Sequence, residues 1–106
     1  MSLFQKLFGR AEYDEAACIR LLFDRTQPLN ERGAAAESLY TGQTPTATAA
    51  LLRFVLDEAE QPELREEAAS TLGSIYNVVG VDHQAMAKIP DHYRNEVLAN
   101  ISKKGA

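Results

Sequence analysis

The chain has 106 residues, of which 45% are hydrophobic and 25% are charged, and its formal net charge at pH 7 is −4. These proportions are typical of a globular domain, so they exclude a disordered chain and a membrane-spanning bundle. The length predicts a single domain with a packed core. The only cysteine, Cys18, has no partner for an internal disulfide, which favours a reducing, cytoplasmic setting.

Residues 1–11 form a separate N-terminal segment with an amphipathic pattern. Two cations accompany apolar residues at helical spacing: Leu3, Phe4, Leu7 and Phe8. The segment is too short and too polar for a signal peptide, and no later run is long enough to span a bilayer, so we expect no stable membrane insertion. We expect the segment to cover the open end of the domain that follows. Contact with a membrane or a partner is the alternative.

Residues 12–106 are expected to form one helical domain, because apolar residues recur there every three or four positions and no strand pattern is found. Thr44 before Pro45 predicts the start of a helix, and Asp82 predicts another. Prolines and glycines separate six expected helices: Glu12–Arg25, Leu29–Tyr40, Thr46–Ala59, Glu63–Val78, His83–Ile89 and Asp91–Lys103.

The sequence repeats itself at an interval of 33 residues. About one or two identities are expected by chance over positions 16–39, but eight are found. Ala16, Ala17, Arg20, Asp24, Arg32, Ala35, Ala36 and Leu39 coincide with Ala49, Ala50, Arg53, Asp57, Arg65, Ala68, Ala69 and Leu72. Such a period is typical of stacked helical units.

A weaker third copy is predicted near the C-terminus, where Arg94 is followed by Val97, Leu98 and Ile101 at the spacing of the second copy. The paired alanines are expected to let neighbouring helices approach closely. One helical hairpin cannot bury both of its faces, so several must stack. We therefore predict an all-α fold, a short right-handed α-solenoid of about three antiparallel helical hairpins, with the irregular third unit as its cap.

The segment Glu63-Leu64-Arg65-Glu66-Glu67-Ala68-Ala69-Ser70-Thr71-Leu72-Gly73-Ser74-Ile75 resembles the second helix of a HEAT repeat. The resemblance extends over about residues 16–101. It implies polar contacts between an aspartate near the turn and the arginine of the second helix, for which Asp24 with Arg32 and Asp57 with Arg65 are the similar pairs. HEAT-like modules are generally scaffolds or binding surfaces, so the resemblance also implies partner binding.

The acidic residues concentrate in the repeats. All 15 lie between Glu12 and Glu96, where only seven basic residues occur, so this part carries a formal charge of −8. Such a field repels phosphates and argues against nucleic-acid binding. A basic protein partner is compatible with it; a solvated surface without a partner is the alternative.

The predicted binding residues lie on the exposed face of the second helices and in the acidic run before the second of them: Glu37, Glu58, Glu63, Glu66, Glu67, Ser70 and Thr71. No catalytic or cofactor site is predicted. The histidines, His83 and His92, lie on different expected helices and lack the spacing of a metal site.

We therefore predict a non-catalytic protein-interaction module. In one version it is a bacterial immunity or inhibitor protein that neutralises a basic toxin or enzyme. The alternative is a structural adaptor or self-associating scaffold component that docks through its apolar ends, and an enzymatic role ranks third. A monomer or a weak homo-oligomer is expected.

Overall fold

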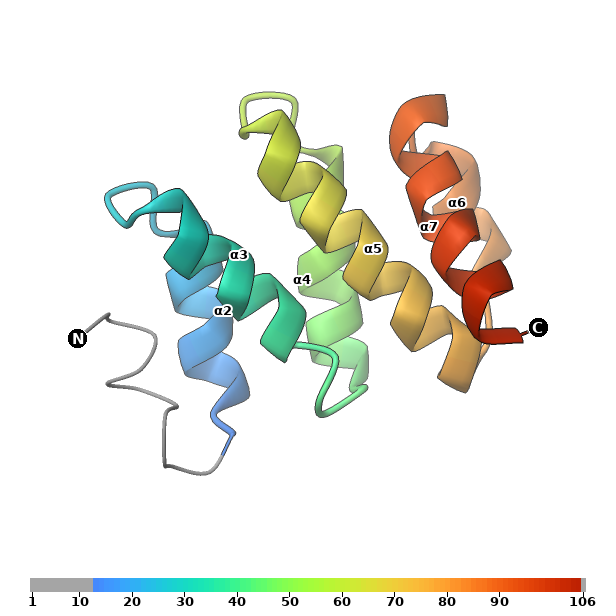
Figure 1. The fold of residues 1–106 in the computed structure, drawn as a ribbon, viewed down its shortest axis with the longest axis horizontal. Coiled ribbons are helices and arrows are strands. Elements are labelled where there is room, and N and C mark those ends of the chain that lie inside the picture. The colour runs from blue at the N-terminus through green and yellow to red at the C-terminus, as the bar shows by residue number, and fades with distance from the viewer. Residues whose placement is uncertain (1–12, 106) are drawn as a thin grey trace.

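The structure, a computed structural model, describes residues 13–105, with side chains described as far as residue 101. This part of the chain is all-helical, as predicted, and has no strand. The helices are α2 (Glu15–Phe23), α3 (Leu29–Ser38), α4 (Pro45–Leu56), α5 (Pro62–Val79), α6 (His83–Lys88) and α7 (Asp91–Gly105) (Figure 1). The expected N-terminal segment, residues 1–11, lies outside the described residues.

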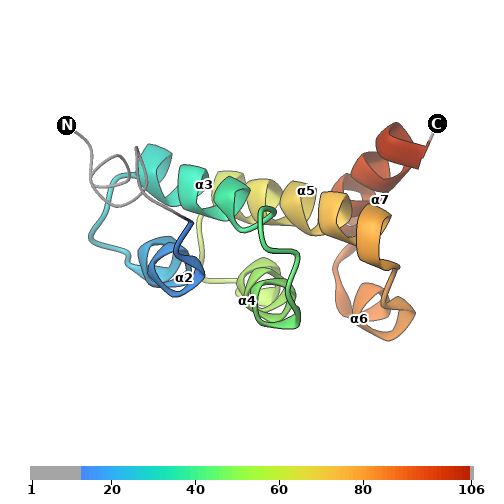
Figure 2. The same cartoon turned by 90° about the horizontal axis from the view of Figure 1, so that it is seen from below.

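The helices form two layers. Helices α2, α4 and α6 make one layer, and α3, α5 and α7 make the other, so the chain alternates between layers (Figure 2). Helix α2 contacts α3, and α4 contacts α5; within the second layer, α5 contacts both α3 and α7. Across residues 13–105, no helix has both the length and the apolar character needed to cross a membrane.

Side-chain caps set the starts of three helices. The Thr44 side chain accepts a hydrogen bond from the backbone of Ala47, and the Asp82 side chain accepts one from Ala85, which confirms both predicted starts. Helix α2 begins later than expected, because Asp14 is its N-cap and accepts from the backbone of Ala17. Each cap satisfies a backbone N–H that has no partner within its helix.

The core lies between the two layers. The alanines Ala35, Ala36, Ala68 and Ala69 are all fully buried. Their small side chains let α3 and α5 approach the helices beneath them, as predicted. The largest side chains that are fully buried fill the remaining space: Leu22, Leu39, Leu51, Phe54, Val55, Leu72, Ile75, Ile89 and Val97.

Two buried arginines repeat the same backbone contact. Arg32 Nε donates to the carbonyl of Leu22 at 2.8 Å, and Arg65 Nε donates to the carbonyl of Val55 at 2.8 Å. The two donors are 33 residues apart, and so are the two acceptors. The sequence repeat therefore recurs in the hydrogen bonding. Each bond ties the second helix of a pair to the end of the first.

The outer ends of these arginines meet different partners. The Arg32 guanidinium donates to Glu60 Oε2 at 2.8 Å, whereas the Arg65 guanidinium lies 4.2 Å from the centroid of the Tyr93 ring. Residues 60 and 93 are again 33 positions apart. We call the Arg32–Glu60 contact the first rung and the Arg65–Tyr93 contact the second rung.

The implied pairs of Asp24 with Arg32 and Asp57 with Arg65 are not formed among the described side chains. Asp24 instead accepts hydrogen bonds from the backbone and hydroxyl of Thr26, which lower its pKa. Asp57 likewise accepts from the backbone of Ala59. A carboxylate directly after a helix reaches the turn that follows it, so both aspartates bond to their own turns. Asp57 also pairs with Arg25, in the turn after α2, at 3.1 Å.

The third sequence copy is matched only in part. Val97 is buried and Ile101 packs against the core, but Leu98 is 45% exposed and Arg94 pairs with Asp91 at the surface. Helices α5 and α7 cross closely at Gly73, where an added Cβ would lie 2.3 Å from the Val97 carbonyl oxygen. The Val97 and Asn100 side of α7 faces this crossing.

Candidate functional site: the groove between α3 and α5

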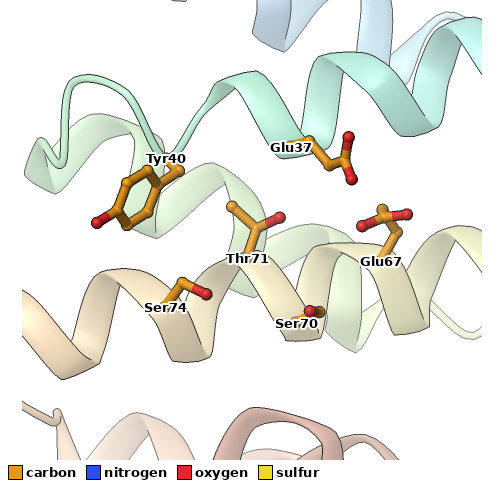
Figure 3. Close-up of a pocket in the computed structure, with 6 residues that line it drawn as sticks. All are labelled: Glu37, Tyr40, Glu67, Ser70, Thr71 and Ser74. Carbon is orange, nitrogen blue, oxygen red and sulfur yellow. The ribbon is translucent and has the colours of Figure 1, made fainter. Parts of the chain in front are cut away.

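A groove of about 240 Å³ runs between α3 and α5 in the second layer. Its walls carry acidic, hydroxyl and aromatic side chains: Glu37, Tyr40, Glu67, Ser70, Thr71 and Ser74. Figure 3 shows Glu37 on α3 and Glu67 on α5 pointing toward one another, with Thr71 beside them and Tyr40 at one end. We call this set of six residues the acidic groove.

Four of the seven predicted binding residues lie in the acidic groove, namely Glu37, Glu67, Ser70 and Thr71. Glu63 lines an adjoining hollow of about 350 Å³ between the same two helices, which shares Glu37 and Glu67 with the groove. The structure therefore joins residues of two helices that are separate in the sequence.

Glu66 and Glu58 lie elsewhere. The Glu66 carboxylate faces α7 and lies 2.5 Å from His92 Nε2. Consecutive helical residues point about 100° apart, so Glu66 and Glu67 belong to different faces of α5. Glu58 lies in the exposed loop between α4 and α5 and lines neither the groove nor the adjoining hollow.

Sequence reasoning missed two lining residues, Tyr40 and Ser74. Tyr40 packs against the edge of the core and also closes one end of the groove. Ser74 follows Ser70 by four positions, a spacing that places both on one helix face and could have revealed it.

The acidic groove is a set of polar groups without partners. None of its six side chains makes a hydrogen bond or an ion pair with another residue in the described part of the chain. Burial raises the pKa of Glu67, and the nearby carboxylates of Glu37 and Glu96 raise it further. Ionisation of Glu67 is therefore less favourable than that of a solvated glutamate, and a nearby cation favours it.

Thr71 is the most enclosed of these groups. It is only 5% exposed, it lines the groove, and its hydroxyl makes no hydrogen bond with the described residues. In Figure 3 its side chain extends from α5 into the space toward α3. Among the described residues only the Tyr76 hydroxyl is a fully buried side-chain polar atom without a partner, so the Thr71 hydroxyl opens onto the groove, where it can bond to water or to a ligand.

The opposite layer presents an apolar surface around α4. One hollow of about 640 Å³ is lined mainly by Phe23, Ala49, Leu52 and Leu56. A second hollow of about 370 Å³ reaches the end of α5 at Tyr76 and Val79. The Tyr76 hydroxyl is buried and has no hydrogen-bond partner among the described residues, and neighbouring Val78 is 54% exposed.

The chemistry of the acidic groove suits binding of cations. It holds two carboxylates and four hydroxyl groups, and neither histidine nor cysteine lines it. Within the described residues, no three His, Cys, Asp or Glu side chains gather so that they could hold a metal ion. The carboxylates and hydroxyls of the groove accept hydrogen bonds, which suits them to a cationic group that carries hydrogen-bond donors.

Comparison with protein-family models, curated proteins and solved structures finds no match to this chain.

Proposed function

We propose that the chain is a non-catalytic protein-binding domain whose acidic groove takes a basic segment of a partner protein. The observation that carries this proposal is the pair of facing carboxylates, Glu37 and Glu67, neither of which has a partner among the described residues. Glu67 is partly buried and Glu37 is exposed. Burial and the nearby Glu37 carboxylate raise the pKa of Glu67, and a bound cation offsets this repulsion.

The charge of the whole repeat region supports the same proposal. The stretch from Glu12 to Glu96 carries a formal charge of −8, so a basic partner is attracted before contact is made. The groove then supplies the short-range contacts. We expect the association rate to fall as salt is added, because screening weakens the long-range attraction.

We further propose that the two layers form a short right-handed solenoid of HEAT-like hairpins, with the acidic groove on the second-helix side. The repeated contacts of Arg32 with Leu22 and of Arg65 with Val55 support this reading. In cells, such a cytoplasmic domain would act as an inhibitor or immunity protein if its groove covers a basic active site. Adding the domain to a captured partner enzyme or toxin tests this version, because inhibition is then expected.

The proposal is tested by capture of partners on three immobilised proteins: the unchanged chain, Glu67→Lys and Glu58→Lys. Both variants change the net charge equally, but only Glu67 lines the groove. We expect a basic protein to be retained by the unchanged chain and by Glu58→Lys, and to be lost with Glu67→Lys. Equal retention on all three proteins would contradict binding in the groove.

A structural adaptor is the second candidate, and the apolar surface around α4 favours it. Phe23, Leu52 and Leu56 line a hollow there, and Val78 and Val79 are more than half exposed nearby. An adaptor would bind or self-associate through this surface without regard to salt. Sedimentation of the chain beside Leu52→Glu distinguishes the two functions, because only self-association through α4 is lost in that variant.

A further inference from the structure

We infer that the hollow between α4 and the end of α5 binds a small neutral organic molecule, which rests its apolar body on α4 and accepts a hydrogen bond from the Tyr76 hydroxyl. We call this site the Tyr76 hollow. Its volume is about 370 Å³, and its walls include Gln43, Thr48, Ala49, Leu52, Tyr76 and Val79. The inference goes beyond the proposed function, because the acidic groove shares no lining residue with this hollow.

The Tyr76 hollow lies where the first layer of helices is least closed. Helix α4 contacts α2 in that layer but makes no comparable contact with α6, which lies beyond it (Figure 2). The apolar side chains at this place are therefore incompletely covered: Leu52 is partly buried and Val79 is 55% exposed. A hollow within the range of about 300–1,000 Å³, with mostly apolar walls and few polar groups, is typical of a small-molecule site.

The Tyr76 hydroxyl is the observation that points to a ligand. Its side chain is 3% exposed and lines the hollow. Among the described residues, it is the one buried side-chain polar atom that has no hydrogen-bond partner. Buried polar groups are nearly always paired, and an unpaired one costs free energy. A molecule that brings a hydrogen-bond acceptor into the hollow removes this cost.

The surroundings of the hydroxyl favour a neutral acceptor. Burial, and then the charge of Asp82, raise the pKa of Tyr76, so the hydroxyl keeps the proton that it donates. Asp82 also lines the hollow. A ligand carboxylate would be repelled by Asp82 and would lose its water against the apolar walls. The oxygen of a ketone, an ester or an amide accepts the same hydrogen bond without these two costs.

The ligand must displace a wall side chain to reach the hydroxyl, because the hydroxyl is closed off from solvent. Val79 is the last residue of α5 and is half exposed, so its side chain has room to turn outward. Gln43, in the loop before α4, has a φ of 51°, the one positive value among the described residues other than glycine. Such a backbone conformation is costly and is concentrated at binding sites.

The test is an NMR titration of the full chain with three probes of nearly the same shape. Acetophenone carries a neutral acceptor, α-methylstyrene has a methylene group in place of the oxygen, and benzoate carries a negative charge. We expect acetophenone to bind about fivefold more tightly than α-methylstyrene, and benzoate to bind most weakly, with amide shifts centred on Val79 and Gly80. Equal affinities for acetophenone and either other probe would overturn the inference.

The variant Tyr76→Phe removes only the hydroxyl. It should weaken the binding of acetophenone about fivefold and leave that of α-methylstyrene unchanged. It should also raise the midpoint of urea unfolding of the unbound protein, because an unpaired buried group is lost. Tyr40→Phe, outside the hollow, is the matched control and should leave both affinities unchanged. A lower midpoint in Tyr76→Phe would mean that water already satisfies the hydroxyl, and the inference then fails.

Two neighbouring valines locate the bound probe. Val78 and Val79 are 54% and 55% exposed, but only Val79 lines the hollow. Val79→Ala should weaken acetophenone binding about threefold, and Val78→Ala should not change it. Equal effects of the two changes would place the probe elsewhere and contradict the inference. If the same amide shifts appear when the chain is concentrated without any probe, a second copy occupies the hollow and the inference is wrong.

Discussion

The first and second rungs begin with equivalent arginines and end on chemically different partners. Glu60 lies between two cations, because Arg25 Nε donates to it at 3.0 Å beside the contact with Arg32. The position equivalent to Arg25 in the second repeat is Glu58, so a carboxylate at position 93 would meet only one arginine there. Tyr93 occupies that position instead and requires no compensating charge.

The comparison shows that one repeated sequence position can join neighbouring helix pairs in two ways. The first rung is a buried ion pair, whose formation must outweigh the loss of water from both charges. The second rung is a cation–π contact, in which only the arginine is charged. The contribution of the first rung to the free energy of unfolding should therefore fall strongly when one partner is removed or when the pH is lowered. The contribution of the second rung should change much less.

The largest effect is expected from Glu60→Ala, which breaks the first rung and leaves the second intact. Both side chains of the pair are nearly buried, with 3% and 2% exposure for Arg32 and Glu60. Removing one partner leaves a buried charge uncompensated, so we expect a loss of about 3–5 kcal/mol in the free energy of unfolding. Urea unfolding measures this loss. A loss below about 1 kcal/mol, as for a surface pair, would contradict it.

Acid provides the check on that result. Burial raises the pKa of Glu60, but hydrogen bonds from Arg32 and Arg25 outweigh this effect, so its pKa in the folded protein is lowered. The stabilisation is complete above the ordinary pKa of 4.5 and is lost as the pH falls through the lowered value. Glu60→Ala should therefore flatten the dependence of stability on pH in this range.

A smaller loss is expected from Gly73→Ala, which disturbs the α5–α7 crossing beside the second rung. The added Cβ would lie 2.3 Å from the Val97 carbonyl oxygen, so the helices must move apart. We expect a loss of about 1–3 kcal/mol by urea unfolding.

Gly33→Ala is the matched control for Gly73→Ala. Gly33 lies in α3, and the nearest atom to an added Cβ is Leu64 Cδ2 at 3.8 Å. This change should stabilise the helix by about 0.5–1 kcal/mol. Two glycine-to-alanine changes in helices should thus have opposite signs, and equal signs would argue against a close crossing at Gly73.

The smallest loss of stability is expected from Tyr93→Leu, which removes the ring of the second rung but keeps an apolar side chain. We expect a loss of about 1–2 kcal/mol from the cation–π contact with Arg65. Tyr93→Phe keeps the ring and should be nearly neutral. If Tyr93→Phe is as damaging as Tyr93→Leu, the ring is not the group that matters.

The sequence predicted where the helices lie better than it predicted which side chains contact one another, because helix starts depend on local signals. Thr44 with Pro45 and Asp82 fix helix starts through their own neighbours, so they are readable from the sequence. The partner of Arg32 lies 28 residues away on another helix pair, and nothing local distinguishes Glu60 from Asp24. The register of α7 depends on contact with Gly73, which a one-dimensional pattern does not contain.

The candidate site was also predictable only in its local features. The acidic run on α5 can be found in the sequence, but the run alone does not show which of its carboxylates face α3. Helical geometry separates Glu67 from Glu66, and the contact between α3 and α5 brings Glu37 to Glu67. Helix α3 ends at Ser38, two residues earlier than expected, and Tyr40, just beyond this end, lines the groove.

The burial of Cys18 makes it a natural reporter of local opening. Its side chain is fully buried in α2, and burial, with the nearby Asp14 and Glu15, raises the pKa of its thiol to about 11. The thiolate that reacts with alkylating reagents is therefore scarce at neutral pH while α2 stays packed. The rate of alkylation in native buffer then measures how often the first helix pair opens, without any introduced label.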